Sequence, residues 1–239
     1  MTKNTVLSLD HVSLKNPKKS RTVLNECSID FSRGVVYVIL TSPSPGKQAL
    51  ISLMAGLEPV QAGKITYHDQ DLSTLDLDEY RAKQIGTVFQ ESNLIDYITP
   101  LENLDFSFHL AGVEGDDLKE RELAILESVG IDKESAMRRV ETLSPEAQKQ
   151  VAVARALASN SDLIIADEPV RGLDDTKYGC VLDVLVKEAH NHQRCVIILT
   201  RSMRIAAYAD ELWGLNQGNL VFIKERQRTL YSHSEKESL

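Results

Sequence analysis

The 239-residue sequence predicts an α/β fold in which helices cover a parallel sheet. Three continuous apolar runs carry this prediction: Val35 to Leu40, Leu163 to Ala166 and Val196 to Leu199. Runs of this kind are typical of strands that are buried on both faces of a parallel sheet. A turn and helix-forming residues follow the first run, and helical sequence separates the second from the third. This alternation of strand and helix favours βαβ units.

The region before the first buried strand predicts an antiparallel hairpin. Residues Leu7 to Val12 and Cys27 to Phe31 alternate apolar and polar side chains, as half-buried strands do. The connection between them is a basic loop, whose charged residues are Lys15, Lys18, Lys19 and Arg21. We therefore expect an antiparallel β subdomain beside the parallel sheet.

The middle of the chain predicts an inserted helical subdomain, at about residues 91–160. This region has little strand signal, and Asp117 to Val129 has helical periodicity with Gly130 as its stop signal. Further on, Trp213 lies in a strand-like segment that we expect to be an edge strand, turning at Asn216 to Gly218. One domain is thus expected over residues 1–226, followed by a polar C-terminal tail, 227–239.

Composition excludes several classes of protein. The net charge of −8 and a pI of about 5.3 argue against a nucleic-acid binder, because such domains usually carry a basic face. The three cysteines are widely separated, which predicts reduced thiols rather than a zinc site or a disulfide framework. No stretch reaches the ~18 apolar residues of a membrane span, and the first residues lack an apolar signal-peptide core. Any association with a membrane is therefore expected to be peripheral.

The segment after the first buried strand partly matches a phosphate-binding loop. In such a loop, backbone N–H groups and a helix N-terminus hold phosphates. Gly46 and Lys47 fit the motif, whereas Thr41 and Ser44 replace glycines and Gln48 replaces the Ser or Thr that binds Mg²⁺. The loop alone supports a structural turn and a nucleotide site equally.

Pro45 changes the chemistry of this loop further. Proline has no N–H to donate to a phosphate, and it biases the preceding residue towards extended geometry. We therefore expect Ser44 to be extended and unable to adopt the conformations open to a glycine.

A second candidate site lies at the end of the buried strand within Leu163 to Pro169. In a phosphate-loop ATPase, Asp167 would hold Mg²⁺ through water and Glu168 would polarise the attacking water. Alternatively, the two acids cap the following turn. Because a phosphate-type loop precedes them in an α/β pattern, the combination favours a nucleotide site.

Four ordered motifs together resemble the nucleotide-binding subunits of ABC transporters, in particular the lipoprotein-release and macrolide-export subgroup. They are IGTVFQESNLIDYITPLENL from Ile85, with Gln90 at the Q-loop position; LSPEAQKQVAVARAL from Leu143, where the family has its LSGGQ signature; IIADEP as the Walker B segment; and Leu173-Asp174 as the D-loop. The resemblance covers about residues 6 to 224.

This resemblance implies a P-loop NTPase core of the RecA-like type, with an antiparallel β subdomain and an inserted helical subdomain. It also implies ATP and Mg²⁺ as cofactors, membrane-spanning transporter subunits as partners, and homodimers or heterodimers that sandwich ATP head to tail. The residues it assigns to nucleotide are Thr41, Ser42, Ser44, Gly46, Lys47, Gln48, Ala49 and, from the opposite subunit, Ser144. It assigns Gln90 and Asp167 to the metal, Glu168 to catalysis, and Arg201 to the switch position.

The sequence departs from the family pattern at most of these nucleotide contacts. Glycines are missing at Thr41 and Ser44 in the phosphate loop, and Pro145 and Glu146 replace the glycine pair of the signature. The aromatic residue that would stack on adenine near residue 16 is also missing. Arg201 replaces a histidine and, because it stays protonated, cannot imitate a neutral imidazole.

These losses predict a transporter cassette with weakened or lost ATP binding and hydrolysis. Since the phosphate loop and the signature are both altered, pairing with an intact subunit would still leave both composite sites damaged. Such a chain would dock on membrane subunits, at the cytoplasmic face of the membrane, as a structural or regulatory partner. The alternatives are an active ATPase with unconventional motifs and a soluble protein of the same fold without a transport role.

Overall fold

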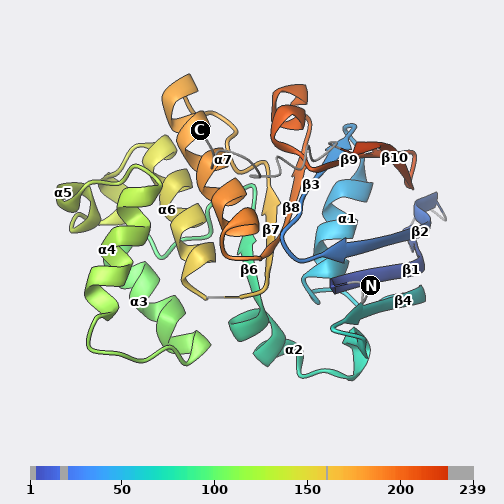
Figure 1. Cartoon of the computed structure of the whole chain (residues 1–239), viewed down its shortest axis with the longest axis horizontal. Helices are drawn as coiled ribbons and strands as arrows, with labels where there is room; N and C mark the ends of the chain where they lie inside the picture. The colour runs from blue at the N-terminus through green and yellow to red at the C-terminus, as the bar shows by residue number, and fades with distance from the viewer. Residues whose placement is uncertain (1–3, 17–20, 160, 226–239) are drawn as a thin grey trace, which may run out of the picture.

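Two sheets and the helices around them make up the fold (Figure 1). The computed structural model describes residues 4–16, 21–159 and 161–225. The strands are β1 (Thr5–Asn16), β2 (Arg21–Ser32), β3 (Val36–Thr41), β4 (Ala62–Tyr67), β5 (Gln70–Asp71), β6 (Ile85–Val88), β7 (Leu163–Asp167), β8 (Cys195–Thr200), β9 (Glu211–Asn216) and β10 (Asn219–Glu225). The α-helices are α1 (Pro45–Met54), α2 (Leu77–Glu79), α3 (Pro100–Ala111), α4 (Leu118–Ser128), α5 (Lys133–Ala136), α6 (Pro145–Ala158) and α7 (Asp175–His190).

The larger sheet has the order β10-β9-β3-β8-β7-β6. All neighbouring pairs from β9 to β6 are parallel, and β10 pairs with β9 in the antiparallel sense. The α/β prediction is therefore confirmed, with the three apolar runs as β3, β7 and β8. The expectation that Trp213 lies on an edge strand is wrong, because β10 covers the outer side of β9 after the turn at Asn216.

Side chains alternate along the central strands and form two separate apolar cores. On β8, Val196 and Ile198 pack on one face with helices α3 to α7, whereas Ile197 and Leu199 pack on the other with α1 and the smaller sheet. This alternation follows from the two-residue period of a strand. A strand buried on both faces needs apolar residues at every position, which explains the unbroken runs in the sequence.

The smaller sheet has the order β2-β1-β4-β5 and lies beyond α1 (Figure 1). The predicted hairpin is confirmed: β1 and β2 are antiparallel, with Leu9 opposite Ile29. Helix α1 begins earlier than its helix-forming sequence suggests, at Pro45, since proline fits the first position of a helix. Lys18 and Lys19 of the basic loop, and the tail 227–239, lie outside the described residues.

Helices α3 to α6 form the predicted helical region on the side of β6 and β7 (Figure 1). The expected helix over Asp117 to Val129 is α4, and Gly130 follows it with a φ of 88°, a conformation that favours glycine. Within the described residues, no helix is both long and apolar enough to cross a membrane.

Glu122 of α4 is a buried carboxyl group inside this helical region, 3% exposed. Burial, with a smaller contribution from Asp105, raises its pKa to about 7. Because the folded state holds the proton more tightly than the unfolded state, this carboxyl lowers stability increasingly as pH rises from about 4.5 to 7.

Glu122→Gln is therefore expected to raise the free energy of unfolding by about 1 kcal/mol at pH 8, with almost no change at pH 5. Urea denaturation at both pH values measures this difference. The exposed Glu127 on the same helix provides a matched control, Glu127→Gln. An equal gain from Glu122→Gln at both pH values would show that packing, and not ionisation, is responsible.

Candidate functional site

The phosphate-type loop connects β3 to α1. Ser44 precedes the helix in an extended conformation, with φ −149° and ψ 157°, and its side chain makes no capping hydrogen bond. The prediction that Pro45 forces Ser44 into extended geometry is therefore confirmed. Since Pro45 is the first helical residue, the helix N-terminus offers one N–H group fewer to an anion.

The other residues of this loop divide into exposed and packed positions. Ser42 and Gln48 are exposed, whereas the side chain of Ala49 is buried in the core below the smaller sheet. The Thr41 hydroxyl donates a hydrogen bond to the carbonyl oxygen of Thr200, at 3.3 Å. Thr41 and Ala49 thus have structural roles that do not require a nucleotide.

Lys47 is the residue on which the predicted site converges. Its ammonium lies 2.5 Å from Asp167 Oδ1 and 3.3 Å from Gln90 Oε1, and Glu168 Oε1 is 3.9 Å away. The side chains of Lys47 and Asp167 are 5% and 1% exposed. The structure therefore brings together the loop lysine, the Q-loop glutamine and the two acids that the sequence singled out. The Lys47 ammonium thus forms an ion pair with the carboxylate of Asp167, at the end of β7.

Gln90 and Asp167 do not form a ready pair of metal ligands. The same Lys47 ammonium is a hydrogen-bond donor to Gln90 Oε1 and to Asp167 Oδ1. The exposed Gln48 amide stands where the motif has a short hydroxyl ligand. In this arrangement the oxygens of Gln90 and Asp167 and the amide of Gln48 therefore do not form a set of ligands that fits a Mg²⁺ ion.

Glu168 is buried, and each of its two carboxylate oxygens accepts a hydrogen bond. Oε2 accepts from the Thr200 hydroxyl at 2.9 Å, and Oε1 accepts from the main-chain N–H of Arg201 at 3.0 Å. Its φ of 49° is unusual for a residue with a side chain and is held by a backbone bond to Leu199. The contact with Arg201 uses the backbone, and the Arg201 side chain is exposed.

The signature segment forms the start of α6. Ser144 caps this helix, and its hydroxyl oxygen accepts from the N–H of Ala147 at 3.2 Å. Glu146 lies in the first turn, where the Ser144 hydroxyl lowers the pKa of its carboxyl group. A negative charge therefore stands at the helix N-terminus that would otherwise attract an anion.

Lys149 is a site residue that the sequence analysis did not identify. It lies on α6, is 7% exposed, and donates to the carbonyl oxygens of Phe89 at 3.2 Å and Gln90 at 2.5 Å. A signal was present in the sequence, because Val153 and Ala156 follow at helical spacing and are buried. A lysine at helical spacing from two apolar core residues is unusual, because lysine side chains are almost never buried without a partner.

Comparison with known proteins decides the family. The sequence profile described as ABC transporter matches residues 24–171, which is more than half of the chain. The chain belongs to the ABC transporter ATP-binding family. The cassette is 30% identical to the ABC transporter ATP-binding protein YclH of Bacillus subtilis over 92% of its own length and 97% of that protein. It is 32% identical to the ABC transporter ATP-binding protein Rv0986 of Mycobacterium tuberculosis, over 92% and 91% of the two chains.

Longer relatives and solved structures agree with this assignment. The cassette is 30% identical to the macrolide export ATP-binding/permease protein MacB of Vibrio parahaemolyticus, but covers only 31% of it. The dimeric MJ0796 cassette bound to ADP and Pi superposes with a TM-score of 0.84 at 25% identity, covering 92% and 99% of the two chains. The cassette therefore has the α/β fold of ABC ATPases.

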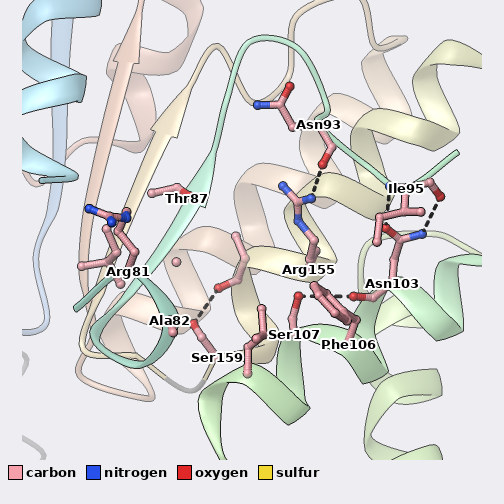
Figure 2. A pocket seen from close by; sticks show the side chains of 14 residues that line it. Arg81, Ala82, Thr87, Asn93, Ile95, Asn103, Phe106, Ser107, Arg155 and Ser159 are labelled. Carbon is pink, nitrogen blue, oxygen red and sulfur yellow. Dashed lines mark hydrogen bonds between the residues drawn. The ribbon is translucent and has the colours of Figure 1, made fainter. Parts of the chain in front are cut away.

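A groove of about 310 Å³ lies on the cassette between β6, α3 and α6 (Figure 2). Phe106 and Leu110 of α3 contribute exposed apolar surface, 50% and 49% exposed. Arg155 of α6 also lines the groove and donates to the carbonyl oxygens of Ser92 and Asn93. The segment that follows Gln90 is thereby attached to the helical region along one wall of the groove.

Proposed function

We propose that the cassette is a subunit of a membrane transporter in which ATP binding is weak and hydrolysis is negligible. Its role would be structural or regulatory. The observation that carries this proposal is the buried pair between Lys47 and Asp167. A nucleotide phosphate would have to displace Asp167 from Lys47 and leave a buried carboxylate without its partner, which is costly.

Other features of the cassette support weak nucleotide binding. Pro45 removes an N–H donor from the phosphate loop, and both oxygens of Glu168 already accept hydrogen bonds. At the signature, Glu146 would repel a phosphate bound at that helix N-terminus. Glu168 itself is retained, so an active ATPase remains the competing function that an experiment has to exclude.

Restoring the loop should increase nucleotide affinity. In a variant with Ser44→Gly and Pro45→Ser, the regained N–H donor and the freer backbone are expected to tighten ATP binding about tenfold. Titration with a fluorescent ATP analogue measures this change. A separate test is the rate of ATP hydrolysis by the wild-type cassette, assayed together with its membrane subunits. A robust Mg²⁺-dependent rate that disappears in Glu168→Gln would refute the proposal.

We also propose that the cassette dimerises and binds membrane-spanning subunits at the cytoplasmic face of the membrane. MJ0796 has been solved as a dimer, and MacB combines ATP-binding and permease functions in one longer protein. The cassette matches 31% of the length of MacB, so the permease function of that protein is not carried over to the residues compared here. The groove beside the segment after Gln90 offers a short amphipathic helix of such a partner an apolar surface with arginines at its border.

Leu110→Lys tests the role of the groove. The change removes apolar contact area and adds a third positive charge near Arg81 and Arg155, so recovery of membrane partners is expected to fall at least tenfold. The measurement is co-purification from solubilised membranes. Ile223→Lys is the matched control, because Ile223 is 50% exposed and lies on β10, away from the groove. Equal recovery of partners with the two variants would place docking elsewhere.

A further inference from the structure

Three charged segments lie at the edge of the larger sheet where its parallel strands end. Strands β7 and β8 are parallel, and helices α6 and α7 run back along one face of them. Helix α6 leads into β7 and helix α7 follows it, so both helices begin at this edge, which is the upper one in Figure 1. The segment after β8 lies there too. We call the start of α6, the start of α7 and the segment after β8 the strand-end surface.

Charges at the start of α7 are neutralised within the chain. The Lys177 ammonium lies 3.4 Å from a carboxylate oxygen of Asp174. The Arg204 guanidinium, from the segment after β8, lies 2.8 Å from Asp175 Oδ1. These two ion pairs leave no net charge on the residues that form them.

Glu146 and Arg201 are charged residues of the same surface that form no ion pair within the part of the chain that the structure describes. The Ser144 hydroxyl lowers the pKa of the Glu146 carboxyl group, so that it is ionised at neutral pH. The Arg201 side chain is exposed, and its main-chain N–H donates to Glu168 Oε1 at 3.0 Å. That bond fixes the base of the Arg201 side chain beside the nucleotide-type site.

Each of these two charges has exposed apolar surface next to it in the sequence. Met203, two residues after Arg201, is 67% exposed, and Pro145 precedes Glu146 and is exposed as well. Methionine and arginine are enriched in protein–protein interfaces relative to the rest of a protein surface. The strand-end surface therefore has the composition of an interface as well as unpaired charges.

Two-fold symmetry would make this surface complementary to itself. In a symmetric dimer, a residue of one copy that meets a second residue of its partner does so twice, because the reverse contact also forms. The proposed head-to-tail dimer brings the start of α6 of one copy against the nucleotide-type site of the other. Glu146 lies in the first of these regions and Arg201 beside the second. The similar cassette MJ0796 has been solved as a dimer.

We propose that Glu146 of each copy pairs with Arg201 of a second copy, and that these two reciprocal ion pairs join the dimer without nucleotide. The Glu146 carboxylate takes the place of a nucleotide phosphate between the copies, because both groups offer anionic oxygens that an arginine binds through two N–H groups. The partner of the strand-end surface is thus a second copy of this chain. This inference rests on the proposed function, in which the cassette dimerises and binds ATP weakly.

Sedimentation velocity of the full-length chain without nucleotide tests the proposal. The wild type is expected to dimerise at concentrations of about 100 µM. Arg201→Glu should weaken association at least tenfold, because it places two carboxylates opposite each other at both symmetric contacts. Glu146→Arg should weaken it equally, through two opposed guanidinium groups. The variant that carries both changes restores opposite charges and should recover association to within about threefold of the wild type.

Arg171 provides a matched control on the same edge of the sheet. It follows β7, is exposed, and forms no ion pair within the described residues. Arg171→Glu changes the net charge as Arg201→Glu does, but should weaken association less than about threefold. Combined with Glu146→Arg, it should not restore the dimer. Equal effects of Arg171→Glu and Arg201→Glu would overturn the proposal, since general repulsion would then explain both.

Other outcomes also decide the question. A chain that is monomeric until ATP and Mg²⁺ are added would overturn the proposal, and so would single variants that associate as the wild type does. If both single variants weaken association and their combination does not recover it, Glu146 and Arg201 do not meet and the proposal fails. ATP hydrolysis by the wild type would contradict the proposed function, whereas these association results concern only the ion pair.

Salt dependence of the wild-type dimer keeps the proposal testable if a variant does not fold. Raising NaCl from about 0.05 M to about 0.5 M should weaken association at least threefold, because salt screens charges at a partly exposed contact. A dimer whose association is unchanged or strengthened by salt would overturn the proposal, because ion pairs would not be what joins the copies.

Discussion

Asp167→Asn is expected to lower the free energy of unfolding by about 3 kcal/mol. The change leaves the Lys47 ammonium buried, with Gln90 and the more distant Glu168 as its remaining partners. Removing one member of a buried ion pair is more destabilising than replacing both, because the remaining charge loses its compensation. Urea denaturation of the nucleotide-free chain measures the effect.

The double variant Lys47→Met with Asp167→Asn identifies the cause. If the pair is a structural unit, the double variant should be at least about 1.5 kcal/mol more stable than the sum of the two single losses predicts. Additive losses would show that Lys47 and Asp167 act independently. Our explanation for weak ATP binding, which depends on a mutual bond between them, would then fail.

Gly86→Ala should have a destabilising effect of similar size, about 3 kcal/mol. Gly86 lies on β6, and a Cβ atom there would be 2.1 Å from the carbonyl oxygen of Ala156 on α6. That oxygen belongs to the backbone, so relief requires the helix and the strand to separate. Thermal and urea unfolding measure the loss, and weaker partner binding should accompany it because both residues line the groove.

Gly179→Ala is the control for Gly86→Ala. Gly179 lies within α7, and a Cβ atom there would have no neighbour within 4 Å. The substitution should raise stability by up to about 1 kcal/mol, because alanine favours the helix more than glycine does. If both substitutions changed stability equally, the close approach of β6 and α6 would not be the reason.

The sequence predicted the buried strands well and the shorter or mixed elements less well. The β8 strand was evident because every residue from Val196 to Leu199 is apolar. Strand β6 gave little signal, since Gly86 and Thr87 interrupt its apolar residues within only four positions. The glycine that weakens the signal is required by the contact with α6, which no local pattern reveals.

The site residues divide in the same way: local motifs identify some of them, and others depend on contacts between distant parts of the chain. Lys47, Gln90, Asp167 and Glu168 could be predicted because ordered motifs identify them, and the structure places them together. The contact of Lys149 with Gln90 joins residues 59 positions apart and depends on how α6 packs. The sequence does not reveal the ion pair between Lys47 and Asp167, because the motifs assign each of these residues to a ligand rather than to the other.

Because side chains alternate along β3, β7 and β8, the same three strands contribute to both apolar cores. Each central strand contributes neighbouring residues to opposite cores, as Ile164 and Ile165 do on β7. Loss of either core would expose one face of the same strands to water and remove support from the other core. Since the same strands belong to both cores, we expect damage in the helical region or in the antiparallel sheet to reduce the stability of the other layer as well.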